Sequence, residues 1–188
     1  MTNKDIINFF FELGQLKKIE HEGWRLAGIN HPETVSDHTL RAAQIGFVLA
    51  KLEKYDNPKE VSTMVIFHDI AECRTGDVHM VANRYIKKEE AQAVKDQLNN
   101  LGDIGQEIYN LWQQVEDQDT TAGKIAREAD LIEQAITAKE YIEQGHTLAQ
   151  DWIDNVEQYV KTQSAKKLLK DLRQAKSTNW WQGLKKIN

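Results

Sequence analysis

The stretch from Met64 to Glu72 joins an apolar run to side chains that bind metals or move protons. Its last five residues are His-Asp-Ile-Ala-Glu, so His68, Asp69 and Glu72 directly follow a segment typical of a protein core. An imidazole and two carboxylates beside a core are costly unless they are paired or coordinate a metal. The adjacent pair His68 and Asp69 therefore indicates two ligands of one metal site.

On a continuous helix, Glu72 shares a face with His68 and Asp69, so one site could engage all three side chains. The alternative is that His68 and Asp69 form a paired core dipeptide and that Glu72 is a solvated charge. A match to two adjacent residues does not separate these interpretations, because such matches are common by chance. The choice depends on candidate ligands elsewhere in the chain.

Two further candidates lie in segments with helical periodicity. His38 falls in the first turn of a helix that begins after Thr34 or Ser36, and Asp130 lies beside the apolar stripe of a later helix. Taken alone, each could be a surface residue or a buried ligand. Periodicity does not distinguish the two.

The elements that must position these residues are predicted to be helices. Only two prolines and ten glycines interrupt 188 residues, and the apolar residues recur at helical spacing, so we predict an all-α fold. The predicted helices span about residues 4–13, 34 or 36 to at least 50, 58–76, 87–101, 104–115 and 120–144, with one or two more within 147–176 and an ordered loop at 15–32.

Composition limits the class of protein and its partners. With 40% hydrophobic and 28% charged residues the chain is globular, and its length suits one domain over residues 1–188. A net charge of -5 argues against nucleic acid as a partner. The single cysteine, Cys73, excludes an internal disulfide, and no apolar run is long enough for a signal peptide or a membrane span. We expect a cytoplasmic protein with a small ligand and no membrane association.

In combination, the spacing of His38, His68, Asp69 and Asp130 resembles the ligand pattern of the HD-domain metal-dependent phosphohydrolases. The resemblance is closest to the 5'-deoxynucleotidase branch and covers about residues 16–141, which leaves a C-terminal helical extension at about 147–188. It implies a single helical bundle with the metal site between core helices. The segments that carry it are Gly23-Trp24, Asn30 to His38, His68 to Glu72, and Thr75-Gly76-Asp77.

This resemblance assigns roles to individual residues. It implies that His38, His68, Asp69 and Asp130 hold one divalent ion, that Glu72 acts on the hydrolytic water, that Asp77 contacts the sugar and that Trp24 lies near the nucleotide. Relatives carry a basic residue close to that tryptophan, whereas here Gly23 precedes it, so Arg25 is the nearby substitute. A homodimer is also implied, with Trp112 and Trp152 as candidate interface residues.

The chemistry of the residues agrees with a phosphatase. Two imidazoles and two carboxylates suit Mn, Co, Ni, Zn or Mg and leave coordination positions for water and a phosphate oxygen. The leading hypothesis is hydrolysis of nucleoside 5'-monophosphates, with deoxyribonucleotides favoured. The alternatives are an HD-type enzyme for a cyclic or pyrophosphate-containing nucleotide, and a metal- or nucleotide-binding protein without turnover. Glu72 argues against the binding protein without turnover, because a pure binding site does not need a carboxylate that is not a ligand.

Overall fold

The computed structural model describes residues 1–186, and within that range it consists of helices and connecting loops without a β-strand. The prediction of an all-α fold is confirmed. None of the helices in this range combines the length and apolar character needed to cross a bilayer. The α-helices are α1 (Asn3–Leu13), α2 (Val35–Leu52), α3 (Pro58–Phe67), α4 (Glu72–Thr75), α5 (Glu90–Leu98), α6 (Gly102–Asp117), α7 (Thr121–Glu143), α8 (Gln150–Tyr159) and α9 (Gln163–Gln174).

Side chains at the helix N-termini fix where the site-bearing helices begin. Thr34 accepts a hydrogen bond from the backbone N–H of Asp37, and the Asp37 carboxylate accepts one from the Thr34 N–H in return. This pair forms a capping box, so α2 begins after Thr34, the first of the two predicted starts. Thr120 caps α7 through the N–H of Gly123. Pro58 occupies the first turn of α3, where a missing N–H costs nothing.

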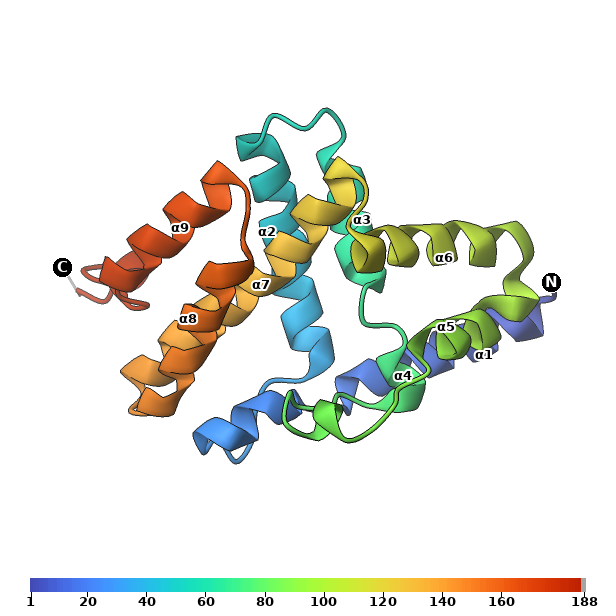
Figure 1. The fold of residues 1–188 in the computed structure, drawn as a ribbon, viewed down its shortest axis with the longest axis horizontal. Coiled ribbons are helices and arrows are strands. Elements are labelled where there is room, and N and C mark those ends of the chain that lie inside the picture. The colour runs from blue at the N-terminus through green and yellow to red at the C-terminus, as the bar shows by residue number, and fades with distance from the viewer. Residues whose placement is uncertain (187–188) are drawn as a thin grey trace.

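Helices α2, α3 and α7 pack together at the centre of the molecule (Figure 1). Gly46 makes this packing close, because a methyl group at that position would lie 3.3 Å from Val61, 3.4 Å from Val65 and 3.5 Å from Ala129. Small residues at such a crossing let helix backbones approach one another. The three helices are thereby held at a fixed spacing near the residues of interest.

The prediction of one helix over residues 58–76 was wrong. Helix α3 ends at Phe67, a turn follows, and α4 begins at Glu72. The physical reason is that two apolar clusters compete for this segment: Val65 packs in the larger cluster with α2 and α7, whereas Ile70 packs in a smaller one with α1, α5 and α6. The turn redirects the chain from one cluster to the other. It also places His68 and Asp69 at the boundary between them.

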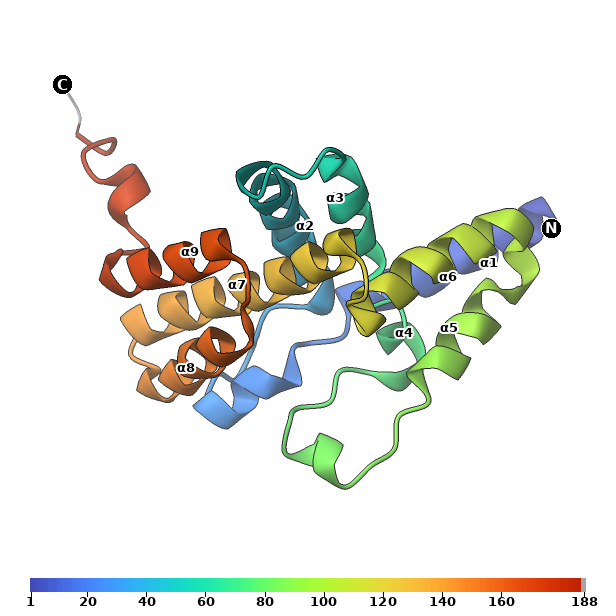
Figure 2. The same cartoon turned by 45° about the horizontal axis from the view of Figure 1, so that its top comes forward.

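The remaining helices flank this centre on opposite sides (Figure 2). Helices α1, α5 and α6 enclose the smaller cluster, and α8 and α9 complete the larger one. The buried carboxylate of Glu128 on α7 accepts hydrogen bonds from the backbone N–H groups of Lys161 and Thr162, the second at 2.8 Å. This contact anchors the start of α9 to the helix that carries Asp130.

Candidate metal centre and adjoining cleft

His38, Asp130 and the turn after α3 meet at one point between α2 and α7. Nε2 of His38 lies 3.2 Å from Oδ1 of Asp130, and Nε2 of His68 lies 3.0 Å from Oδ2 of Asp69. Each carboxylate lies 3.9 Å from the other imidazole. The four residues predicted as ligands are therefore brought together from three separate segments of the chain.

The orientation of His68 fits a metal ligand. Its Nδ1 lies 2.6 Å from the carbonyl oxygen of Val65, which can only accept, so Nδ1 carries a proton and Nε2 is the nitrogen left for a metal ion. This Nε2 is buried and makes no hydrogen bond with any residue in the described range. A buried nitrogen without a partner, beside two carboxylates and a second imidazole, is a donor set that suits a divalent ion.

Glu133 is a site residue that the sequence analysis missed. Its fully buried carboxylate accepts a hydrogen bond from Nδ1 of His38, and it also contacts Arg41 at 2.7 Å and Thr137 at 2.9 Å. A partner on the second imidazole nitrogen orients the ring and fixes its tautomer. Spacing carried a signal, since Glu133 follows Asp130 by one helical turn, but Glu133 was hidden among apolar residues assigned to the buried stripe.

Arg127 and Gln134 were also missed, and both contact Asp130 from the same face of α7. Arg127 Nη1 lies 2.8 Å from Oδ2, and Gln134 Nε2 lies 2.7 Å from Oδ1. His21 completes the surroundings, with its ring centroid 4.5 Å from that of His38. His21 was not singled out from the sequence, yet its ring lies near Asp69. His21 and Asp69 are 48 positions apart, so no local pattern in the sequence indicates that they lie close together.

Opposing forces set the protonation of the buried pair His38 and Asp130. Burial lowers the pKa of His38, but Asp130 and Glu133 raise it well above its ordinary value. Burial raises the pKa of Asp130, but Arg127 and the two imidazoles lower it well below its ordinary value. Both shifts favour the charged forms of His38 and Asp130 in the ion-free protein.

Glu72 differs from the other carboxylates near the site. Its Oε2 is buried and no described residue hydrogen-bonds to it. Burial, and then the neighbouring carboxylates of Asp69 and Asp77, raise the pKa of Glu72 to about 9. Glu72 therefore retains a proton at neutral pH in the ion-free protein, which is a property of groups that donate protons in catalysis.

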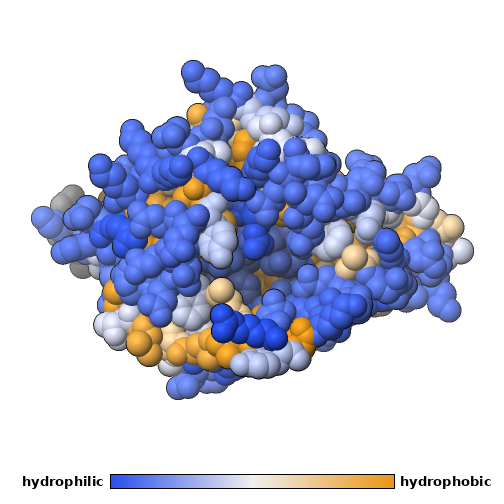
Figure 3. Space-filling model, in the orientation of Figure 1, coloured by the Kyte–Doolittle hydropathy of each residue, from blue (hydrophilic) through white to orange (hydrophobic). Residues whose placement is uncertain are grey.

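A cleft of about 700 Å³ adjoins the cluster and opens on the face seen in Figure 3, where the surface is hollowed in front of α7. Its size is within the usual range for small-molecule sites. One wall comes from α7 and α8, and the other from η2 (Glu22–Ala27) and the segment after Gly76. The residues that line it include His21, Trp24, Asp77, Lys124, Arg127, Gln134 and Lys161.

The structure places the three predicted substrate residues differently. Asp77 lines the cleft, and its Oδ2 accepts a 2.6 Å hydrogen bond from the backbone N–H of Glu22. Trp24 also borders the cleft but is only 2% exposed, since it stacks on Trp152 with ring centroids 4.9 Å apart. Arg25 is not among the lining residues. Its guanidinium contacts the carboxylates of Glu20 and Glu22 and the carbonyl of Asn30.

The chain matches the model of a known protein family. Residues 13–173 match the HD domain model, a span that includes His38, His68, Asp69 and Asp130. The chain belongs to the HD domain family. Membership implies that the His–Asp cluster binds a divalent metal ion, in agreement with the geometry of the buried donors.

Alignments with individual relatives cover most of the chain. It is 35% identical over 153 residues to 5'-deoxynucleotidase HDDC2 of Dictyostelium discoideum, which covers 76% of this chain and 80% of that protein. It is 30% identical over 185 residues to human 5'-deoxynucleotidase HDDC2, which covers 94% and 88%. A solved structure of a conserved hypothetical protein from Pyrococcus furiosus is 27% identical, covers 90% of this chain and 99% of its own, and superposes with a TM-score of 0.78.

Proposed function

We propose that this HD-domain protein hydrolyses nucleoside 5'-monophosphates to nucleoside and phosphate, with deoxyribonucleotides as the favoured substrates. The observation that carries the proposal is a His–Asp cluster that adjoins a cleft of about 700 Å³, together with Glu72, whose buried Oε2 has no hydrogen-bond partner in the described structure. The names of the relatives, 5'-deoxynucleotidase, support the substrate class.

His38, His68, Asp69 and Asp130 would hold one divalent ion, with Mn, Co, Ni, Zn or Mg as candidates. When bound, such an ion polarises the phosphoryl group and acidifies a coordinated water. Glu133 would keep the His38 ring in place by accepting the Nδ1 proton, as the carbonyl of Val65 does for His68.

Glu72 would act as the proton donor or acceptor of the reaction. In hydrolysis, the water oxygen forms a bond to phosphorus and the bond between phosphorus and the 5' oxygen breaks. One proton of the water stays with the phosphate, and the other passes through Glu72 to the 5' oxygen. The raised pKa of Glu72 in the ion-free protein favours the protonated carboxyl that this transfer needs. Its partly buried position limits access of bulk water to that proton.

Asp77 and Trp24 would bind the nucleoside from the cleft. Asp77 lies in the lining with its second oxygen available, while Oδ2 is tied to the backbone of η2. Trp24 offers little free surface and would act mainly by holding the wall in place. A substrate contact by Arg25 stays a prediction that the position of its guanidinium does not support.

Three broader expectations also stay predictions: one domain over residues 1–188, a cytoplasmic location, and a homodimer. The tryptophans considered for the dimer interface give it no support, because Trp112 is buried in the smaller cluster and Trp152 stacks on Trp24.

The test is phosphate release by the metal-stripped protein, re-supplied separately with Mn, Co, Ni, Mg or Zn, on ribo- and deoxyribonucleoside 5'-monophosphates. We expect turnover with at least one ion and higher kcat/KM for deoxyribonucleotides. Turnover only of a cyclic or pyrophosphate-containing nucleotide would transfer the proposal to another HD-type hydrolase. Metal and nucleotide binding without turnover of any of these compounds would refute catalysis.

A further inference from the structure

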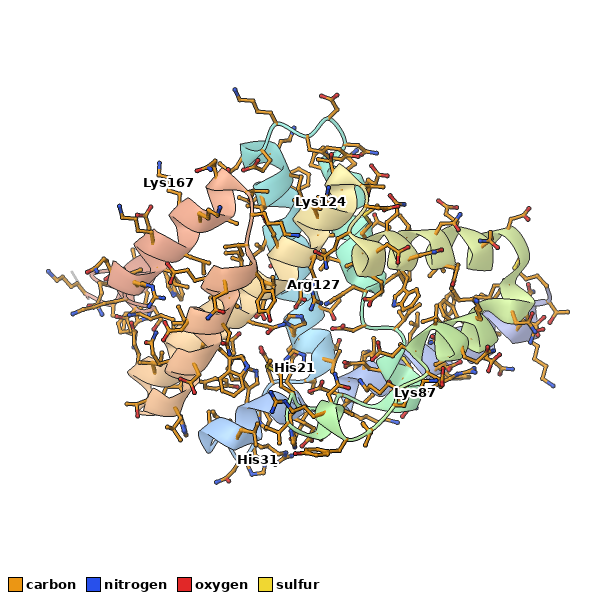
Figure 4. All side chains as sticks on the ribbon, viewed as in Figure 1. His21, His31, Lys87, Lys124, Arg127 and Lys167 are labelled. Atoms are coloured by element: carbon orange, nitrogen blue, oxygen red, sulfur yellow. The ribbon has the colours of Figure 1, made fainter. Side chains whose placement is uncertain are left out.

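Arg127 connects the His–Asp cluster to the cleft. Its Nη1 lies 2.8 Å from Oδ2 of Asp130, while Oδ1 of the same carboxylate faces His38 and Gln134. The guanidinium and the imidazole therefore bind Asp130 from different sides. Figure 4 places Arg127 at the centre of the face on which the cleft opens, between Lys124 and His21.

The side chain has donors to spare. A guanidinium carries five N–H groups, and the ion pair with Asp130 uses one of its terminal nitrogens. The Arg127 side chain is 41% exposed although Asp130 is buried, so part of the guanidinium faces the space that it lines. Its planar fork matches two oxygens of a phosphate, which a lysine cannot do.

The other cations near the cleft do not combine these two properties. Lys124 and Lys161 line the cleft, but neither contacts a residue of the His–Asp cluster in the described structure. Arg25 is occupied by Glu20 and Glu22. Among the cations of the described cleft, Arg127 is thus the one that is fixed beside a predicted metal ligand.

We propose that Arg127 binds the phosphate of the substrate through paired N–H···O hydrogen bonds while it remains attached to Asp130. The ligand class is a phosphate monoester dianion, and the inference rests on the proposed function for the identity of that ester. Arg127 would orient the phosphoryl group beside the His–Asp cluster. It would thereby supply the basic side chain for which the sequence suggested Arg25.

Charge predicts two effects of opposite sign. Replacing Arg127 by Gln removes a positive charge beside Asp130, so divalent-ion affinity should stay the same or increase. Phosphate loses charge-assisted hydrogen bonds and should bind about 10- to 100-fold more weakly. If Arg127 only held Asp130 in position, its replacement would instead weaken ion binding.

The experiment measures Mn²⁺ binding, and then inorganic phosphate binding to the Mn²⁺-saturated protein, by calorimetry for wild type, Arg127→Gln, Arg127→Lys and Lys167→Gln. Lys167 lies on α9, away from the cleft, and controls for loss of one charge (Figure 4). We expect phosphate affinity to fall strongly in Arg127→Gln, to fall less in Arg127→Lys and to be unchanged in Lys167→Gln.

Wild-type phosphate affinity in Arg127→Gln, or weaker Mn²⁺ binding in that variant, would overturn the inference. If Arg127→Gln does not fold, the test rests on Arg127→Lys, which keeps the positive charge but loses the planar guanidinium. Unchanged phosphate affinity in Arg127→Lys would then contradict the inference. Nucleotide turnover does not enter these measurements. Failure of the proposed function would appear separately, as a wild-type protein that binds phosphate but hydrolyses no nucleotide.

Discussion

Nδ1 of His38 on α2 shares a buried hydrogen bond with Oε2 of Glu133 on α7, across 95 positions of the chain. Glu133 in turn contacts Arg41 and Thr137, and Arg41 reaches Glu140 at 2.9 Å. This chain of contacts runs from the His–Asp cluster along the face of α7 that packs against Arg41. It is therefore expected to control how firmly His38 is presented to an ion.

The first prediction concerns Glu133. Glu133→Gln keeps the size of the side chain but removes the charge that stabilises the His38 N–H, so divalent-ion affinity should fall about 10- to 100-fold. Glu140→Gln is the matched control, because Glu140 shares Arg41 but does not contact His38. Equilibrium dialysis with Mn²⁺ checks both variants, and equal affinities would show that Glu133 does not support the ligand.

A second prediction concerns catalysis by Glu72. Glu72→Gln preserves shape but cannot exchange a proton, so kcat should fall about 10²- to 10⁴-fold while ion content and nucleotide affinity change little. A variant that loses the ion would identify Glu72 as a further ligand. Wild-type kcat would make it a passive residue. Ion analysis, nucleotide binding and turnover on the same preparation distinguish these results.

Glu72 also predicts a pH dependence of stability in the ion-free protein. The pKa of this carboxyl is about 9 in the folded state against 4.5 as its ordinary value, so between these pH values unfolding releases a proton. The titration of Glu72 therefore lowers the free energy of unfolding as pH rises, by up to about 1.4 kcal/mol per pH unit. Above about pH 9 the dependence ends.

Urea unfolding in the presence of a chelator, at several values from pH 5 to 9, tests this dependence. Other groups titrate in both proteins, so the informative quantity is the stability of Glu72→Gln minus that of wild type. We expect the difference to increase with pH. A constant difference would mean that Glu72 ionises normally in the folded protein.

A fourth prediction concerns Glu128, which holds the start of α9. Glu128→Ala leaves the N–H groups of Lys161 and Thr162 without their acceptor, so the free energy of unfolding should fall by about 1–3 kcal/mol. Glu157→Ala is the comparison, because Glu157 is largely exposed and pairs with Arg173 at the surface. Similar urea midpoints for the two variants would contradict a structural role for Glu128.

Local patterns in the sequence were enough to predict the site-bearing helices. Helix starts at about residues 34 or 36, 58 and 120 were predicted from residues within a few positions, and the structure begins these helices at Val35, Pro58 and Thr121. The break after Phe67 was not predicted, because it arises from competition between two clusters whose other members lie far along the chain.

The site residues also divide into those that a sequence pattern predicts and those that only the packed structure reveals. His38, His68, Asp69 and Asp130 could be named in advance through their resemblance to a family pattern, whereas Glu133 and Arg127 carry no such pattern. Their importance comes from contacts with His38 and Asp130, which exist only once α2 and α7 are packed together. The exposure of Arg25 and the burial of Trp24 likewise depend on neighbours such as Glu20 and Trp152.

The close crossing at Gly46 predicts that the protein folds before it binds metal. Because Gly46 packs on Val61, Val65 and Ala129, the apolar core fixes the helices that carry His38 and Asp130. Ion binding then requires little ordering of the chain, unlike a zinc finger, which folds only with its metal. The protein is therefore expected to accumulate as a folded apoprotein when metal is scarce, so that metal supply regulates its activity without changing its abundance.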